Sequence, residues 1–363
     1  MIEKGKISAF QLAFLILSLI ISTAILNIPI ITGRFAHHDM WISPILASLN
    51  GFLTAFIVYQ LHKIYPKETI IQYSQHIMGR ILGKILGFVI LFIFLHVCGI
   101  IAREYADFII AAVLHKTPMV VITGSIILVC AFAVRGGVEV LGRVAQIFIP
   151  LLMLPLLLFV LLIPQFKPEN LFPIMEHGIM PPIMGATGVI VWFGEIFLIS
   201  MLLPFLTDRE KGMKWSMISV VVGMLTMVYL NIVIIFLLGE SAITYRFPVF
   251  LGFRYISVAN FFENLESLVV AMWVMGAFIK LSVFYYALVL GTAQWLHLSD
   301  YRPLVFPFGF LTTLFAIWVS PNAQELSKFS RTILPFYATS IMTFIPIVLL
   351  CIAIIQKKWK NKY

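Results

Sequence analysis

Apolar stretches about as long as a membrane-crossing helix recur along the whole chain. A helix needs about 20 mostly apolar residues to cross the hydrocarbon core of a bilayer. The stretches are continuous rather than alternating, which excludes a membrane barrel of strands. Only 11% of the 363 residues are charged and the mean hydropathy is +1.03, so too few polar groups exist to cover a water-facing surface. The sequence therefore predicts an all-α integral membrane protein, embedded in a lipid bilayer.

Ten such stretches can be distinguished, and no segment between them is long enough for a separate soluble domain. Residues 70–84 are amphipathic and are expected along the cytoplasmic surface of the membrane. Residues 238–266 are expected to fold over the outer mouth as a short helix or a surface for a partner. We therefore expect one permease-like transmembrane domain over residues 1–363. The stretches cover residues 9–32, 42–61, 85–114, 120–134, 145–163, 183–205, 215–238, 268–290, 303–319 and 333–355.

Basic residues are unevenly divided between the two sides of this predicted membrane protein. Of the 25 lysines and arginines, sixteen fall on the side of the N-terminus and seven on the other, while Arg103 and Lys280 lie within stretches. Lysine and arginine near the ends of spans favour the cytoplasmic side. We therefore expect both termini in the cytoplasm, and we attribute the net charge of +9 to topology rather than to nucleic-acid binding.

The sequence carries no motif of an enzyme or of a metal site. The patterns GxSxG, GxxxxGK[ST] and HExxH do not occur in it. Cys98, Cys130 and Cys351 lie inside apolar stretches without the spacing of metal ligands, so they are predicted to be small buried side chains. The sequence thus predicts a protein that is not an enzyme and that has no cofactor and no metal.

The stretch over residues 183–205 contains three glycines and an acid. Loosened backbone and buried charge are both costly inside a membrane, yet Gly194 and Glu195 stand side by side near the middle of this stretch. The Glu195 carboxyl can accept a substrate ammonium, hold a proton or bond to unwound backbone. The alternative is a structural carboxyl bonded to a neighbouring helix.

The first stretch is interrupted in a matching position. Ser22, Thr23 and Ala24 are small, and Pro29 removes a helical donor. If the helix unwinds there, free N–H groups can hold a carboxylate; the alternative is an ordinary kinked helix. Two broken spans in matching positions of two halves indicate a transporter-type site at the bilayer midplane. The predicted substrate-binding residues are Ser22, Thr23, Ala24, Ile25, Leu26, Trp192, Phe193, Gly194 and Glu195.

Charged residues in two further stretches are candidates for coupling or gating. Arg103 and Asp107 are four residues apart and can meet on one helix face, with Tyr105 between them. They form either a structural ion pair or a substrate gate. Lys280 is a single ammonium among apolar neighbours and needs a carbonyl or carboxylate partner. It either replaces a coupling cation against the first stretch, or it is an ion-paired or interface-reaching lysine.

The order of these features resembles the amino acid–polyamine–organocation permease superfamily, and within it the spore germination permease family. The resemblance rests on the interrupted first span that ends in Leu26-Asn27-Ile28-Pro29, on Phe193-Gly194-Glu195 in the sixth span, and on a short lysine-rich tail. It implies a LeuT-like fold with two inverted five-helix repeats, over about residues 9–163 and 183–355, in which the first and sixth helices are broken.

The resemblance also implies a function. The chain would be the B subunit of a germinant receptor in the inner spore membrane, where it binds an amino acid or similar small germinant. It would act with an A-type subunit and a lipoprotein C-type subunit. A proton-coupled or exchange amino acid permease is the first alternative, and a structural subunit with a vestigial cavity is the second.

Overall fold

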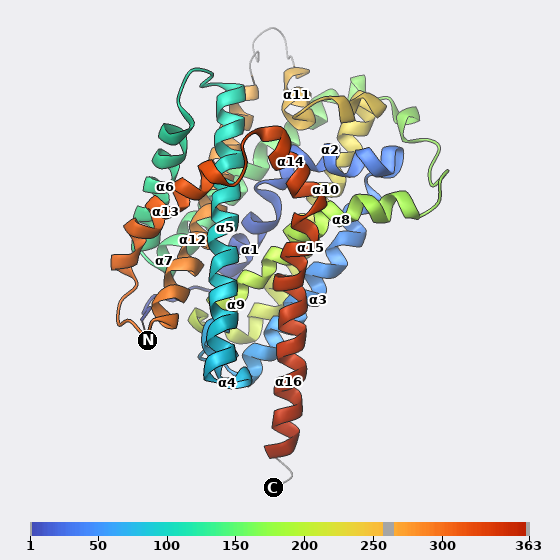
Figure 1. Ribbon diagram of the computed structural model, residues 1–363. Helices are drawn as coiled ribbons and strands as arrows, with labels where there is room; N and C mark the ends of the chain where they lie inside the picture. The colour runs from blue at the N-terminus through green and yellow to red at the C-terminus, as the bar shows by residue number, and fades with distance from the viewer. Residues whose placement is uncertain (1, 257–264, 361–363) are drawn as a thin grey trace.

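The chain folds into a bundle of helices (Figure 1). The structure is a computed structural model that describes residues 2–256 and 265–360. Within those residues the strand-type pairing is one parallel bridge between Ile7 and Leu206. Figure 1 shows α11 and α14 at one end of the bundle, with α4 and both chain ends toward the other. We call these the upper end and the lower end.

The helices of the first half are separated by short turns. Their bounds are α1 (Ala9–Ile21), α2 (Ala24–Ala36), η1 (His37–Asp39), α3 (Ile42–Ile64), α4 (Ile70–Met78), α5 (Arg80–Ala112), α6 (Met119–Arg135), α7 (Val138–Met153), and the 3-10 segments η2 (Leu154–Gln165) and η3 (Pro168–Leu171).

The second half contains more short helical pieces than the first. Its elements are α8 (Met180–Gly194), η4 (Glu195–Leu198), α9 (Ile199–Leu202), η5 (Leu203–Phe205), α10 (Arg209–Leu238), η6 (Gly239–Thr244), α11 (Pro248–Arg254), α12 (Glu266–Trp295), η7 (Arg302–Leu304), α13 (Val305–Trp318), α14 (Ala323–Thr332), α15 (Leu334–Thr339), the π-helical η8 (Ser340–Phe344) and α16 (Ile345–Lys360).

The long helices confirm the membrane class. Among the described residues, seven helices are long and apolar enough to cross a membrane, and two bent pairs raise that number to nine. The pairs are α1 with α2, bent by 46°, and α13 with α14, bent by 96°. The fourth expected stretch corresponds to α6, a shorter apolar helix. Each of the ten expected stretches thus coincides with a helix, while length and apolarity support up to nine spans.

The two predicted breaks have different forms. The first is a bend between α1 and α2 at Ser22 and Thr23. At the second, α8 passes into the 3-10 segment η4 at Glu195, so the helix changes type rather than bending sharply. The further interruption expected at Pro29 is wrong. Because a proline removes only one helical hydrogen bond, α2 continues through Pro29 to Ala36.

Two expectations for the connecting segments are confirmed in part. The surface helix expected over residues 70–84 is α4, but α5 already starts at Arg80, because Gly79 turns the chain with a φ of 84°. In the segment 238–266, α11 is the expected short helix, and residues 257–264 lie outside the described residues.

The N-terminal segment straps the lower end of the bundle. Ile7 exchanges backbone hydrogen bonds with Phe205 and Thr207. The buried carboxylate of Glu3 accepts hydrogen bonds from the hydroxyls of Tyr286 and Tyr301, at 3.2 and 3.1 Å. Burial and the Glu3 charge raise the pKa of the Tyr301 hydroxyl well above its usual value, so it remains a donor. The strap therefore ties the start of the chain to its second half.

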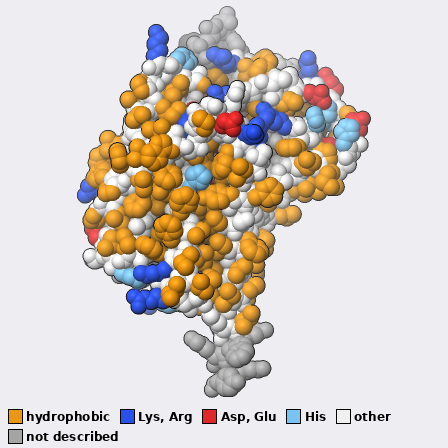
Figure 2. Space-filling view, in the orientation of Figure 1, with side chains coloured by type: hydrophobic (Ala, Val, Ile, Leu, Met, Phe, Trp, Pro, Cys, Tyr) orange, Lys and Arg blue, Asp and Glu red, His pale blue; other side chains and the backbone are white. Residues whose placement is uncertain are grey.

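The surface and the core are both apolar. Figure 2 shows hydrophobic side chains over the middle of the bundle and most charged side chains toward the two ends, as a bilayer requires. Cys98 and Cys130 are buried, as expected. Cys351 is exposed, against expectation, because it lies on the side of α16 that faces away from the bundle.

Candidate functional site

A buried ion pair lies where the two predicted breaks meet. The ammonium of Lys280, on α12, lies 2.6 Å from Oε2 of Glu195, the first residue of η4. The same ammonium donates a hydrogen bond to the hydroxyl of Thr23, at 2.9 Å. Lys280, Glu195 and Thr23 are 1%, 4% and 2% exposed. We call these three residues the buried cluster.

Small residues allow the three elements to come this close. Thr23 lies at the bend between α1 and α2, where it forms the N-cap of α2. Gly276 lies one turn before Lys280 on α12, and a Cβ there would be only 3.1 Å from the side chain of Ser22. A larger residue at that position would push α12 away from the bend, so the sequence Gly276-x-x-x-Lys280 delivers the ammonium to the break.

The charges of the buried cluster depend on one another. Removing a partner from a buried ion pair leaves an uncompensated charge, which costs about 3–5 kcal/mol, and charge inside a membrane marks functional positions. The Thr23 hydroxyl supplies a neutral acceptor on the other side of the ammonium. Chemically, the arrangement holds one cation between the two breaks. Among the described residues there is no group of acids, histidines and cysteines that could hold a metal ion.

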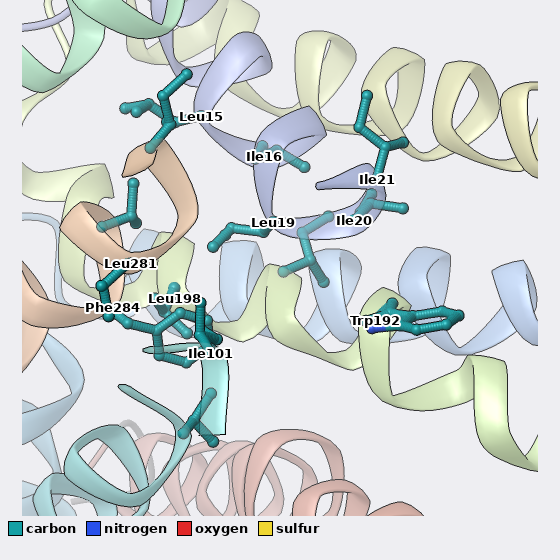
Figure 3. Packing of buried hydrophobic residues seen from close by; sticks show 14 of the residues in the cluster. Leu15, Ile16, Leu19, Ile20, Ile21, Ile101, Trp192, Leu198, Leu281 and Phe284 are labelled. Atoms are coloured by element: carbon teal, nitrogen blue, oxygen red, sulfur yellow. The ribbon is translucent and has the colours of Figure 1, made fainter. Parts of the chain in front are cut away.

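Apolar side chains seal the buried cluster toward the lower end. Figure 3 shows Leu281 and Phe284 of α12 gathered with Leu198 and Ile101, below Leu19 of α1. All five side chains are at most 3% exposed. Because charged and polar molecules do not cross such a layer readily, it separates the buried cluster from the lower end in this conformation.

A cavity of ≈ 110 Å³ lies between the upper parts of α2, α5, α12 and α14. Its apolar lining includes Trp273 and Phe247. Trp273 also borders a void of ≈ 10 Å³ against Ser22, Ile25 and Leu26, so its indole stands between the cavity and the bend. The polar lining comes mainly from Asn27, Glu104, Asp107, Arg246, Ser327 and Arg331.

Glu104 connects the cavity with the buried cluster. Its side chain lines the cavity and lies within electrostatic range of Lys280, Glu195 and Asp107. Arg246 and Arg331 line the same cavity. The cavity thus offers carboxylates and guanidinium groups to a small molecule that carries both signs of charge.

The predicted pair on α5 is formed. Arg103 Nε lies 3.2 Å from Oδ1 of Asp107, and Asp107 lines the cavity. The Arg103 guanidinium also donates to the carbonyl of Ser320, at 2.6 Å. Arg103 therefore has a structural role at the Ser320 carbonyl, whereas Asp107 borders the cavity. Tyr105 is buried and does not line the cavity.

The predicted substrate-binding residues fall into three places. Thr23 and Glu195 belong to the buried cluster, and the fully buried Ala24 follows Thr23. Ser22, Ile25 and Leu26 line the small void beneath Trp273.

The third place is the packing of α8. Phe193 packs against Gly51 of α3, and Gly194 faces Asn50. Figure 3 shows Trp192 on α8, apart from the apolar group around Leu281. The structure thus brings Glu195 to the first break and directs its two preceding neighbours to α3.

Several cavity residues could not be selected from the sequence. Glu104 is an exception in part, because it is one of the three charged residues of its apolar stretch, with Arg103 and Asp107, although the sequence assigned it no role. Trp273 has the appearance of an ordinary core residue. Ser327 and Arg331 belong to α14, which reaches the cavity only through the 96° bend after α13, and no local pattern announces such an angle.

Comparison with protein families and curated proteins gives a consistent result. A sequence model of a family described as spore germination protein matches residues 6–326. Spore germination protein KB of Bacillus subtilis (strain 168) is 26% identical over 99% of this chain and 98% of its own length. Spore germination protein XB of Bacillus anthracis is 24% identical, over 76% of this chain and 78% of its own.

Solved structures of transporters share the fold. Mhp1, a nucleobase-cation-symport-1 family transporter in a closed conformation with bromovinylhydantoin bound, aligns with a TM-score of 0.59 at 14% identity, over 95% of this chain and 78% of its own. A mutant of the manganese transporter of Eremococcus coleocola aligns with a TM-score of 0.57 at 15% identity, over 95% of this chain and 76% of its own. The expected LeuT-like fold is confirmed, and both of these solved structures that share it are transporters.

Proposed function

The chain belongs to the spore germination protein family, and from this premise we propose that it is the germinant-sensing B subunit of a spore germinant receptor. It binds an amino acid or a similar small molecule between the breaks at Thr23 and Glu195. It lies in the inner spore membrane with both termini in the cytoplasm. It acts with an A-type subunit and a lipoprotein C-type subunit to trigger germination.

The observation that carries this proposal is the buried cluster beneath a charged cavity. Lys280 holds Glu195 at 2.6 Å and Thr23 at 2.9 Å, so the break is already occupied by an ammonium that belongs to the protein. A ligand ammonium that enters past Glu104 and reaches Glu195 competes with Lys280 for the Glu195 carboxylate. The ligand carboxylate takes the N–H groups at the start of α2, where the helix dipole favours an anion.

This competition converts binding into a conformational signal. When the ligand replaces Lys280, the ammonium loses a partner that holds α12 against η4. A ligand shifts an equilibrium only through different contacts in the two states, and the exchange at Glu195 supplies that difference. Ordered contacts among α1, α8 and α12 then change together, which presents a new surface to the partner subunits.

A proton-coupled or exchange amino acid permease is the second candidate function. It is favoured by the fold, which Mhp1 and a manganese transporter share. The two functions use the same site and differ in whether the ligand crosses the membrane. Uptake of a labelled ligand into proteoliposomes separates them: accumulation supports the permease, and binding without accumulation supports the sensor.

The proposal is tested by ligand-dependent thermal stabilisation of the purified protein in detergent. The panel consists of amino acids, sugars and nucleosides. A ligand at 100 times its Kd adds about 2.7 kcal/mol to the stability of the folded state. We expect an increase in melting temperature with an amino acid, lost in Glu195→Gln and kept in Glu176→Gln, a matched change at an exposed carboxylate.

A second preparation makes the negative result informative. The same panel is applied after co-purification with the A-type and C-type subunits. If neither preparation is stabilised by any ligand, or if Glu195→Gln responds as the parent does, the proposed site is contradicted.

A further inference from the structure

A single guanidinium holds the sharper of the two bent helix pairs among the described residues. α13 ends at Trp318 and α14 begins at Ala323, at an angle of 96°. A helix that ends in such a bend leaves its last carbonyls without helical donors. Arg103, on α5, donates from Nη1 to the carbonyls of Ala316, Ile317 and Ser320, at 3.4, 3.5 and 2.6 Å. Its positive charge also suits the negative end of α13.

Burial and close helix packing around Arg103 hold its guanidinium against the end of α13. Arg103 is 4% exposed, so the group is removed from water and depends on these acceptors. Gly99 lies one turn earlier on α5, and a Cβ there would be 2.9 Å from the side chain of Phe315. α5 can therefore approach the end of α13 closely enough for Arg103 to reach three carbonyls.

The orientation of α14 decides the shape of the cavity. Leu326, Ser327, Ser330 and Arg331 all lie on α14 and line the cavity. The helix begins at the cap formed by Asn322, whose Oδ1 accepts from the backbone of Glu325 at 2.9 Å. With ten residues α14 is about 15 Å long, so a rotation of about 20° at the bend moves its far end by roughly 5 Å.

The same guanidinium is linked to the cavity. Asp107 pairs with Arg103 at 3.2 Å and lines the cavity wall that faces α14. A cationic group bound in the cavity is a second partner for that carboxylate and weakens its hold on Arg103. The Asp107 carboxylate can therefore bind either a cation in the cavity or the guanidinium that supports the bend.

We propose that Arg103 is a positioning residue that sets the angle of α14 over the cavity, and that Asp107 relays the presence of a cationic ligand group to that angle. The relay deepens the proposed sensing function and rests on it, because it assumes that the ligand enters through this cavity. The positioning of α14 stands on the contacts alone.

The test measures the distance between spin labels on α14 and on α6, in detergent. The labels are attached at Lys328→Cys and Val120→Cys, both exposed, in a Cys351→Ser background. Arg103→Lys keeps the charge but has one nitrogen in place of the guanidinium fork, so it lacks the separate Nε that binds Asp107 while Nη1 binds the carbonyls. We expect Arg103→Lys to broaden and shift the distance distribution, and Arg103→Gln to do so further.

A matched control separates this effect from the loss of an ion pair. Arg143 forms the same four-residue pair with Glu139 on α7, but at the surface. Arg143→Gln should leave the distance distribution unchanged. If Arg103→Gln does not fold, Arg103→Lys decides, because it keeps a charge beside Asp107. A distribution in Arg103→Lys equal to that of the parent overturns the positioning role.

The relay is tested with methylammonium, compared with sodium chloride at equal ionic strength. We expect methylammonium to shift the parent distribution toward that of Arg103→Lys, and to have no effect in Asp107→Asn. An unchanged parent distribution, or an equal shift in Asp107→Asn, overturns the relay. Neither result depends on Glu195, so a failed relay and a failed germinant site remain distinguishable.

Discussion

The energetic effect of a buried charged residue in this protein depends on the groups that it contacts in the low-dielectric interior. Lys280 is 1% exposed and is balanced by Glu195 and Thr23. Buried pairs of this kind are not strong stabilisers by themselves, because desolvation offsets most of their attraction. Each charge of the pair is tolerated in the interior only while the other is present. A second cation near Glu195 would therefore compete with Lys280 for its partner.

Lys280→Met is expected to lower stability by about 3–5 kcal/mol, because it leaves the Glu195 carboxylate buried without its partner. The double variant Lys280→Met/Glu195→Gln should recover most of this loss. Thermal unfolding in detergent measures both. Lys116→Met, at an exposed lysine, is the control and should remain within about 0.5 kcal/mol of the parent. A double variant no more stable than Lys280→Met would show that the charges are not coupled.

Thr23→Val is expected to cost about 1–3 kcal/mol, because valine has the shape of threonine but removes one of the two acceptors of the buried Lys280 ammonium. Thr23→Ser keeps the hydroxyl and should lose less. Chemical unfolding in mild detergent compares the two variants. Equal losses would mean that the methyl group, and not the hydrogen bond to Lys280, makes position 23 sensitive.

At the scale of elements, short irregular pieces position the charged groups. The bend between α1 and α2, the 3-10 segment η4 and the turn between α13 and α14 each break an otherwise apolar helix. Each break is also contacted by a side chain that is distant in the sequence: Lys280 contacts the first two, and Arg103 contacts the third. The N-terminal strap follows the same principle, since Glu3 bonds to Tyr286 and Tyr301.

Glu3→Gln is expected to loosen the strap, because hydrogen bonds to a charged group contribute about 1.5–3 kcal/mol and the amide accepts less strongly. Hydrogen exchange followed by mass spectrometry should show faster exchange at the start of α7, where the Val138 amide donates to Glu3 at 3.4 Å. Glu176→Gln, at an exposed carboxylate, should change nothing there. Unaltered exchange in Glu3→Gln would remove the carboxylate from the strap.

For the whole molecule, the upper cavity and the apolar seal lie on opposite sides of the buried cluster. The cavity lies toward the upper end. The packed group around Leu281 and Phe284 (Figure 3) follows Lys280 along α12 toward the lower end. In the described conformation the apolar group therefore separates the buried cluster from the lower end. Transport would require the seal to open, whereas sensing requires only a rearrangement around the cluster.

Access from one side is expected to appear in thiol labelling of proteoliposomes with a membrane-impermeant reagent. In a Cys351→Ser background, Asn27→Cys in the cavity lining should react from the upper face. Leu198→Cys in the seal should stay unreactive from both faces without ligand. Rapid labelling of Leu198→Cys from the lower face would contradict a closed lower end.

Much of the fold follows from local pattern. Each expected apolar stretch became a helix, because apolar length and the need to satisfy backbone groups in lipid act within a single segment. Small residues at Ser22 and Thr23 likewise marked the first break, and Gly194-Glu195 marked the change of helix type in the sixth span. The permease-like class and the positions of its two breaks were thus determined by the sequence itself.

Tertiary structure alone decided which groups meet. Lys280 required a partner, but its choice of Glu195 and Thr23 depends on the crossing of α12 with two distant breaks. Phe193 and Gly194 stand beside Glu195 in sequence and yet pack on α3, because successive residues of a helix point in different directions. The cavity needed the 96° turn that brings α14 over α5. Hydropathy is a property of each segment, so the sequence alone predicted the helices. The angles and contacts between helices arise from packing between segments, so the site could be assembled only from the tertiary structure.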